Sequence, residues 1–263
     1  MSTTHLIFRC VATAALLACA SVSAGALELK SYKDGLFAYP AVLETSENGA
    51  FLKLDYQEMR DINGRDEIAE RRVKGRYVSL GVKRAQAFET VSFGGRSIDV
   101  LRVGELASAR FAVIFIHGRG GDRKLGADDF RFGGNFNRLK NLAVENSGVY
   151  YAASVKSFDA DGAADVAALI SHVADAAPKA RIVLSCASMG SFVCWDLSRQ
   201  KPVVSQLAGM MIMGGATDAG FANSAAYKAR LPLFFSHGSR DSVYAAPEQI
   251  QLYKALIGQG YPT

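Results

Sequence analysis

The sequence predicts an α/β protein with a doubly wound, mostly parallel sheet that is preceded by antiparallel strands. Two observations predict this fold class. From residue 111 onward, short segments that are apolar throughout alternate with helical patterns, whereas residues 51–103 contain only β-like runs separated by turns. Continuously apolar strands are typical of a sheet that is covered on both faces. The repeated order of strand, helix and strand makes neighbouring strands parallel.

The composition indicates a folded domain with a full core. The chain has 263 residues, of which 49% are apolar and 21% charged, and this excludes disordered, collagen-like and coiled-coil proteins. Lys and Arg total 30 against 25 Asp and Glu, and the charges are spread along the chain, which gives no indication of nucleic-acid binding. Because neither a linker nor a repeat is evident, residues 25–263 are predicted to form a single domain.

The first 24 residues have the pattern of a secretory signal peptide. Arg9 precedes an apolar stretch over residues 11–20, and small residues follow at 22–26. The stretch is short for a membrane span, so we expect no span and a secreted or periplasmic protein. A competing interpretation is a lipoprotein processing box at residues 16–19, in which Cys19 would carry a lipid anchor.

Cys186 and Cys194 are the two cysteines that remain after removal of residues 1–24. They fall at the end of a predicted strand and in the helix that follows it. We expect the bend between strand and helix to keep the two side chains apart, and therefore no disulfide.

The amino-terminal part of the domain is predicted to form hairpins. Turn signals at Asn63-Gly64 and Gly94-Gly95 punctuate this region. The predicted strands cover residues 51–56, 76–82, 87–93 and 97–103. Residues 61–76 are dense in both signs of charge and are interpreted as a solvated helix or loop.

The remaining chain supplies the parallel strands and the helices. The predicted parallel strands are residues 111–116, 149–153, 182–184, 209–213 and 233–235. Helical spacing predicts a helix over 163–177, with Asp161 as its cap and Pro178 as its stop. A last helix opens at Pro247 and ends at Gly258.

A serine stands on the turn between one predicted strand and the next helix, in Cys186-Ala187-Ser188-Met189-Gly190. On a sharp strand-to-helix turn the hydroxyl is pushed clear of the backbone, and small neighbours such as Gly190 allow strand and helix to pass closely. Cys186 stands where the G-x-S-x-G pattern has its first glycine. The alternative is a serine-rich turn that caps an ordinary helix.

A glycine-rich loop, His117-Gly118-Arg119-Gly120-Gly121, directly follows the strand at 111–116. Glycines let backbone N–H groups face a site without obstruction, which suits stabilisation of an oxyanion. The rival interpretation is a dinucleotide-binding loop, but that pattern would need glycine where Arg123 stands.

A third motif, His237-Gly238-Ser239-Arg240-Asp241, follows the strand at 233–235. A carboxylate at this strand end, such as that of Asp241, could orient a general-base histidine. The alternative is an ordinary turn aspartate. Open α/β sheets place their ligands at the carboxyl ends of the strands, where all three motifs fall.

Together the three motifs resemble the α/β-hydrolase superfamily, in particular its serine esterases and lipases, over roughly residues 111–262. The resemblance implies that Ser188 is the nucleophile and Asp241 the triad acid. It implies an oxyanion hole made by the N–H groups of Met189 and of Arg119 or Gly120. Asp218 is a second possible acid, because some members of the superfamily place it after the preceding strand.

The histidine departs from this resemblance, because the family places it after the acid and no histidine follows Asp241. His117 and His237 are interpreted as loop-packing residues and His172 as a surface residue, with His237 a poor candidate for reaching Ser188. The family would continue beyond Thr263 with a strand and a loop histidine. We therefore expect either that the sequence given lacks the end of the natural protein or that the protein has lost catalysis.

The leading hypothesis is a serine hydrolase that cleaves a small-molecule carboxylic ester or thioester through an acyl-enzyme. The alternative is a non-catalytic binding protein on the same fold. No metal and no organic cofactor are implied, since neither HExxH nor CxxC occurs. Arg119, Arg123 and Lys124 flank the glycine-rich loop and could attract an anionic substrate, or could simply be solvated.

Overall fold

The computed structural model describes residues 27–66 and 71–263, so the predicted signal peptide and Cys19 lie outside the described residues. The main sheet has seven strands in the order β3-β4-β6-β5-β7-β8-β9. The strands are β3 (Gln86–Phe93), β4 (Arg96–Val103), β5 (Phe111–Ile116), β6 (Val149–Ala153), β7 (Arg181–Ala187), β8 (Leu207–Met213) and β9 (Leu233–Ser236). The predicted fold class is confirmed.

Among the seven strands of this sheet, β4 alone runs in the opposite direction. It pairs in antiparallel fashion with β3 and with β6, whereas β6, β5, β7, β8 and β9 are parallel to one another. Gly94 and Gly95 both have positive φ and make the β3–β4 turn, as predicted. The parallel strands therefore bring their carboxyl ends, and the three motifs that follow them, to one edge of the sheet.

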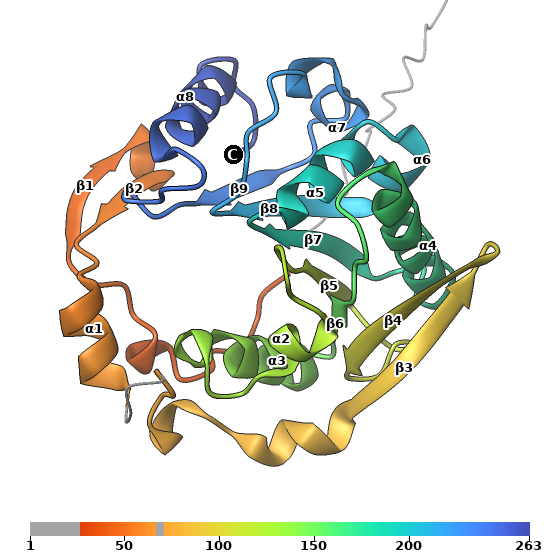
Figure 1. Ribbon diagram of the computed structural model, residues 1–263, viewed down its shortest axis with the longest axis horizontal. Helices are drawn as coiled ribbons and strands as arrows, with labels where there is room; N and C mark the ends of the chain where they lie inside the picture. The colour runs from red at the N-terminus through yellow and green to blue at the C-terminus, as the bar shows by residue number, and fades with distance from the viewer. Residues whose placement is uncertain (1–26, 67–70) are drawn as a thin grey trace, which may run out of the picture.

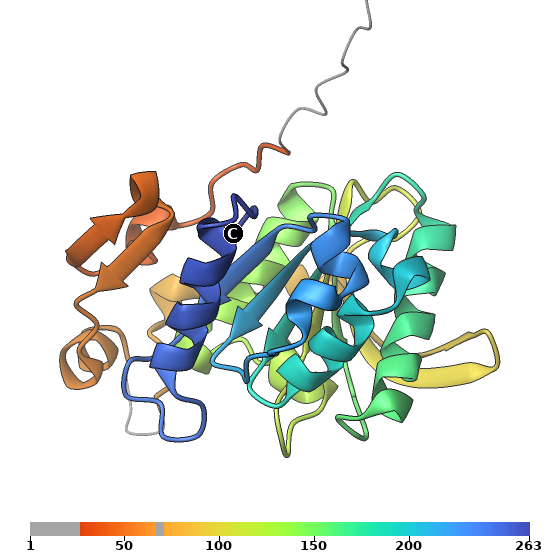
Figure 2. The same ribbon diagram turned by 90° about the horizontal axis from the view of Figure 1, so that it is seen from above.

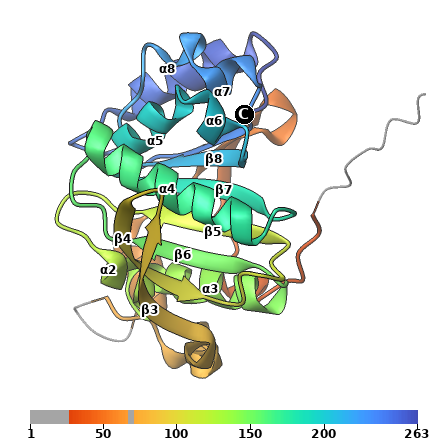
Figure 3. The same cartoon turned by 90° about the vertical axis from the view of Figure 1, so that its right-hand side faces the viewer.

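Helices cover both faces of the sheet (Figure 1 and Figure 3). The helices are α1 (Glu58–Arg65), α2 (Arg123–Ala127), α3 (Asn135–Glu145), α4 (Ala160–Ala176), α5 (Gly190–Ser198), α6 (Lys201–Val204), α7 (Ala225–Lys228) and α8 (Ala246–Ile257). The sheet has a hydrophobic core on each face, and successive residues of β5 point into different cores. Ile114 packs in the cluster that includes α4 and α5, and Phe115 packs in the cluster that includes α3.

The α4 helix exists as predicted, but its cap is a different residue. Asp159, not Asp161, precedes the helix, and its carboxylate accepts hydrogen bonds from the N–H groups of Asp161 and Gly162. Asp161 pairs instead with Arg96 on β4, at 2.8 Å. Both residues suit a cap chemically. The helix begins at Ala160, three residues before the start that its apolar spacing predicts.

The segment before β3 differs most from the prediction. Residues 76–82 form no strand, because two short 3₁₀ helices, Gly75–Tyr77 and Leu80–Ala85, occupy this region. Their tight turns bury Tyr77 and Val82 from a short length of chain. Asn63-Gly64 lies inside α1 rather than in a hairpin turn.

A separate two-stranded sheet, β1 (Val42–Ser46) and β2 (Phe51–Leu54), lies beside α8 and far from the β3–β4 hairpin (Figure 1 and Figure 2). The Phe51 ring contacts Tyr253 of α8, with 5.8 Å between ring centroids. No helix in the described part of the chain is long and apolar enough to span a membrane.

Candidate active site

Ser188 occupies a strained turn between β7 and α5. Its φ of 51° lies in the left-handed region that residues with a Cβ rarely adopt. The Ser188 N–H donates to Met213 O of β8 at 3.0 Å, and Ser188 O accepts from Ser191 N at 3.0 Å. Such conformations persist only where the surroundings enforce them, and they gather at functional sites. We call residues 186–190 the elbow.

Gly190 explains how α5 can start so close to the sheet. A Cβ on Gly190 would lie 2.7 Å from His117 O and 2.9 Å from Ile116 O, and backbone atoms cannot move aside easily. The helix therefore packs directly against the end of β5. This close approach brings the loop after β5 next to Ser188.

The glycine-rich loop touches the serine itself. A Cβ on Gly118 would lie 2.7 Å from Ser188 Cβ and 3.1 Å from Ser188 Oγ. The Gly121 N–H donates to Gly118 O at 3.2 Å, and Gly120 has a φ of 74°, as the third position of a type II turn requires. Within residues 27–66 and 71–263, the N–H groups of Arg119 and Met189 donate to no protein acceptor. Neither amide is therefore committed to a hydrogen bond in this part of the protein.

The buried His117 ring fixes the glycine-rich loop through hydrogen bonds to Gly118 and Val155. The ring is 1% exposed, and its Nδ1 lies 2.6 Å from Gly118 O, while its Nε2 accepts from the Val155 N–H at 3.1 Å. A carbonyl can only accept and an N–H can only donate, so these partners assign the neutral ring with its proton on Nδ1. Because the peptide is trans, binding of Gly118 O turns the Arg119 N–H to the opposite side.

Asp241 lies at the same edge, in the loop between β9 and α8. Its Oδ2 would be 3.6 Å from a Cβ on Gly214, which follows β8. Its Oδ1 accepts from the N–H groups of Val243 and Tyr244, at 2.8 Å and 3.1 Å. These two hydrogen bonds lower the pKa of Asp241 below its usual range, and the bond from Tyr244 has the largest effect. The nearby His237 lowers this pKa further. The Tyr244 ring contacts Phe192 of α5, which joins this loop to the elbow's helix.

His237 is bound within the Asp241 loop. Its Nε2 lies 2.8 Å from Tyr244 O and 3.5 Å from Asp241 Oδ2, and its Nδ1 lies 3.0 Å from Gln249 Oε1. His117 is likewise fully bonded, and His172 contacts Phe93 on the β3–β4 hairpin. Among the described residues, no side chain forms a hydrogen bond with Ser188 Oγ.

This chain is similar to known proteins in its structure rather than in its sequence. No protein-family model matches the chain, and no curated protein matches its sequence. A protein of unknown function from Agrobacterium tumefaciens, named provisionally as an α/β hydrolase, matches with a TM-score of 0.50 at 14% identity, over 65% of this chain and 79% of that one.

Two further structures match with lower scores. The Pyrococcus furiosus esterase Pf2001 aligns at 15% identity over 70% of this chain and 82% of its own, with a TM-score of 0.48. Epoxide hydrolase VrEH1 from Vigna radiata aligns at 17% identity with a TM-score of 0.38, over 52% of this chain but only 43% of its own length. The Agrobacterium match and the observed strand order are consistent with each other.

The chain has the α/β-hydrolase fold. At 14% identity the similarity to the Agrobacterium structure extends to the fold alone. Within this fold, the structure brings Ser188, Gly118 and the loops of Arg119 and Asp241 together at the carboxyl edge of the sheet. That is the edge at which ligands bind in open α/β sheets.

The expectation of free cysteines was wrong. Cys186 and Cys194 form a disulfide with Cα atoms 6.3 Å apart. In the hydrolase fold α5 runs back along β7, so residues eight apart on either side of the turn come level, within the 4.4–6.8 Å that a disulfide needs. The number of residues around the bend therefore does not indicate how far apart the two side chains lie.

Asp218 has a different environment from Asp241. Both of its carboxylate oxygens accept from Arg199 Nη2, each at 2.7 Å, and Oδ1 also accepts from the Gly220 N–H. The pair ties the loop after β8 to the end of α5. This carboxylate is therefore already bound by a cation.

The three basic residues near the glycine-rich loop also differ. Arg123 turns to β3 and β4, where it donates to Glu89 O at 2.9 Å and lies over the Phe88 ring. Arg119 and Lys124 are exposed. Arg123 thus anchors α2, and of these three residues Arg119 and Lys124 are the ones that face solvent.

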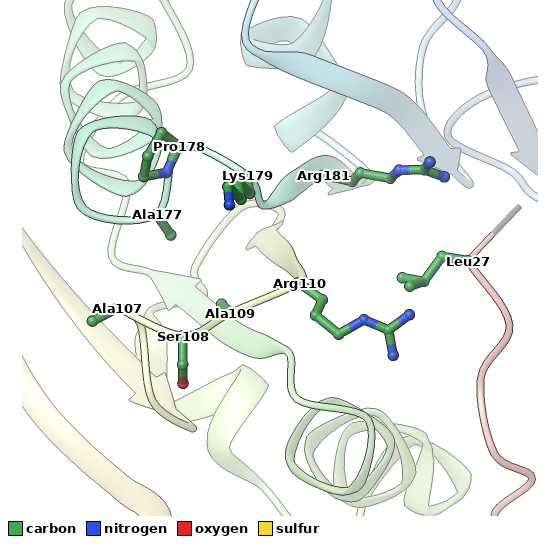
Figure 4. Close-up of a pocket in the computed structure, with 9 residues that line it drawn as sticks. All are labelled: Leu27, Ala107, Ser108, Ala109, Arg110, Ala177, Pro178, Lys179 and Arg181. Atoms are coloured by element: carbon green, nitrogen blue, oxygen red, sulfur yellow. The ribbon is translucent and has the colours of Figure 1, made fainter. Parts of the chain in front are cut away.

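An open cavity of about 580 Å³ lies elsewhere, at the amino ends of β5 and β7, the opposite edge of the sheet from Ser188. Figure 4 shows Arg110, Lys179 and Arg181 around it, with Leu27 beside them. In the described ranges, no group of His, Cys, Asp and Glu is arranged to hold a metal ion.

Proposed function

We propose that this protein is a serine hydrolase that cleaves a carboxylic ester or thioester of a small molecule through an acyl-enzyme. The left-handed Ser188 at the β7–α5 turn carries the proposal, because a strained serine at this position of this fold is the signature of an exposed nucleophile. The adjacent glycine-rich loop is its second support.

In the proposed reaction Ser188 Oγ attacks the carbonyl carbon of the substrate. The negative charge that develops on the carbonyl oxygen is stabilised by the N–H groups of Met189 and of Arg119 or Gly120. The tetrahedral intermediate expels the alcohol or thiol, which leaves with the proton that Ser188 Oγ has lost, and an ester remains on Ser188. Water then releases the acid and restores the serine.

Asp241 is the proposed acid of the triad, and Arg199 makes Asp218 the weaker candidate. The acid would orient an imidazole and stabilise its protonated form. His117 and His237 both use their ring nitrogens in other bonds, so neither is assigned as the base that takes the serine proton.

The proposal includes a secreted or periplasmic location. Support comes from the buried Cys186–Cys194 disulfide, because such bonds persist in oxidising compartments. The amino-terminal pattern of residues 1–24 is the other support. A lipid anchor on Cys19 stays an open alternative.

A second candidate function rests on one observation. Ser188 Oγ has no hydrogen-bonding base within the described residues, as expected of a binding protein that retains the hydrolase fold without its chemistry. Such a protein would hold an ester or acid at the same edge without cleaving it.

A fluorophosphonate probe tests the proposal. It should label the protein on Ser188, as located by peptide mass spectrometry, and should not label Ser188→Ala, since only an activated serine reacts quickly. Asp241→Asn should lower p-nitrophenyl acetate turnover more than tenfold, with Asp218→Asn within twofold of the wild type. Absence of labelling together with binding of a non-cleavable ester analogue would favour the binding protein.

A further inference from the structure

The Cys186–Cys194 disulfide encloses the elbow. Cys186 is the penultimate residue of β7, and Cys194 is the fifth residue of α5. Ser188 and Met189 form the whole connection between the two elements. Both cysteines are fully buried, so the bond lies inside the contact between strand and helix.

The elbow needs restraint on both sides. The left-handed Ser188 is unfavourable for a residue with a Cβ, and it persists only if strand and helix are held at a fixed angle. On the strand side, β7 is fixed by its pairing with β5 and β8. On the helix side, noncovalent restraints come from Gly190 against His117 O and from Ser191 Oγ, which accepts from the Ala216 N–H at 3.0 Å.

The residue types at the elbow make the covalent restraint significant. The G-x-S-x-G pattern places glycine at the first position, but this chain has a cysteine there, and its side chain points into the strand–helix contact. The sulfur atoms join the two elements at the level of Cys186, two residues before the serine. The cross-link therefore acts where a rotation of α5 would move both Ser188 and the Met189 N–H.

We propose that the Cys186–Cys194 disulfide is a positioning element, which fixes α5 on β7 and so sets Ser188 and the Met189 N–H in register with the Gly118–Arg119 loop. The inference rests on the proposed function and adds a requirement: the site is fully ordered only in a chain that has folded under oxidising conditions. Because both sulfur atoms are buried, the bond must form during folding rather than afterwards.

The test compares two disulfide-free variants with a destabilised control. Cys186→Ala/Cys194→Ala removes the bond, and Cys186→Ala/Cys194→Val removes it while restoring part of the lost volume. Leu101→Ala is the control, because Leu101 is fully buried on β4 in the core on the other face of the sheet. All four proteins are studied well below their melting temperatures.

The expected result is a slower reaction of Ser188 with the fluorophosphonate probe in both disulfide-free variants, by about tenfold, as a small misplacement of a reacting group can produce. For p-nitrophenyl acetate we expect kcat to fall with KM nearly unchanged. The Leu101→Ala control should react at the wild-type rate despite its lower stability. Wild-type rates in both disulfide-free variants would overturn the positioning role.

A wild-type protein that does not react with the probe would count against the proposed function but would not test the role of the disulfide. Amide hydrogen exchange tests that role separately. A positioning disulfide predicts that exchange at residues 190–192 accelerates about tenfold more than exchange at the centre of α4 when the bond is removed. Equal acceleration in α4 and α5, as in a general loss of stability, would refute it.

Discussion

The same dipeptide, His-Gly, follows two parallel strands of this sheet and is used in two different ways. After β5, His117 is buried and a side chain on Gly118 would collide with Ser188. After β9, His237 bonds within its own loop, and a Cβ on Gly238 would meet nothing within 4 Å. The first turn is a central part of the site, and the second turn carries Asp241 toward it.

The difference follows from the position of each strand in the sheet. β5 lies in the interior between β6 and β7, so the loop after it is packed against the elbow and the chain after β6. β9 lies at an edge, so the loop after it has one neighbouring strand and must be stabilised by hydrogen bonds of its own. Identical sequence signals therefore acquire their meaning from strand order.

Alanine at the two glycines gives the largest expected contrast. Gly118→Ala places a Cβ 2.7 Å from Ser188 Cβ, so the serine or the loop must shift. We expect fluorophosphonate labelling of Ser188 to slow about a hundredfold, with a loss of about 1–3 kcal/mol in unfolding free energy. Gly238→Ala is the matched control, and its labelling rate and denaturation midpoint should stay at the wild-type values. Equal labelling rates in Gly118→Ala and Gly238→Ala would contradict the different roles assigned to the two His-Gly turns.

Much of this contrast lies beyond what the sequence alone can predict. The strands at 111–116 and 149–153 were predicted to the residue, because continuous apolar runs bounded by polar turns leave no other element. The role of His117 depends on the Val155 N–H, which lies 38 residues away in the sequence. The residues around His117 do not predict such a distant partner. The Cys186–Cys194 bond was missed for the same reason: it depends on how a helix returns along its strand.

The predicted strand at residues 76–82 failed for a physical reason. This segment looks like a strand because it is rich in β-favouring residues such as Tyr77, Val78 and Val82, but it lies before the sheet begins and reaches the core through two 3₁₀ turns. The three motifs, by contrast, were placed at the correct edge because they directly follow buried parallel strands, whose direction the fold dictates.

Two substitutions of His117 give a smaller and more specific effect. The amide nitrogen of asparagine lies near the position of Nδ1, so His117→Asn keeps the donation to Gly118 O and loses the bond with Val155. The amide oxygen of glutamine lies near the position of Nε2, so His117→Gln accepts from the Val155 N–H and loses the bond with Gly118 O. If Gly118 O sets the direction of the Arg119 N–H, kcat for p-nitrophenyl acetate should fall about tenfold more in the Gln variant. The reverse order would show that the Val155 bond matters more than the loop's carbonyl.

The smallest expected effect concerns the second turn and its dependence on pH. Hydrogen bonds from Tyr244 and Val243 lower the pKa of Asp241 in the folded protein. A carboxyl whose folded pKa is depressed contributes stability above its unfolded pKa of about 3.9, and this contribution is lost as the pH falls through the folded value. Asp241→Asn should therefore lower the urea midpoint at pH 7, and the difference from the wild type should shrink between pH 5 and pH 2. A difference that stays constant over this range would mean that the amides of the β9–α8 loop bind Asp241 no better folded than unfolded, and the loop would then owe its shape to His237 and Gln249 instead.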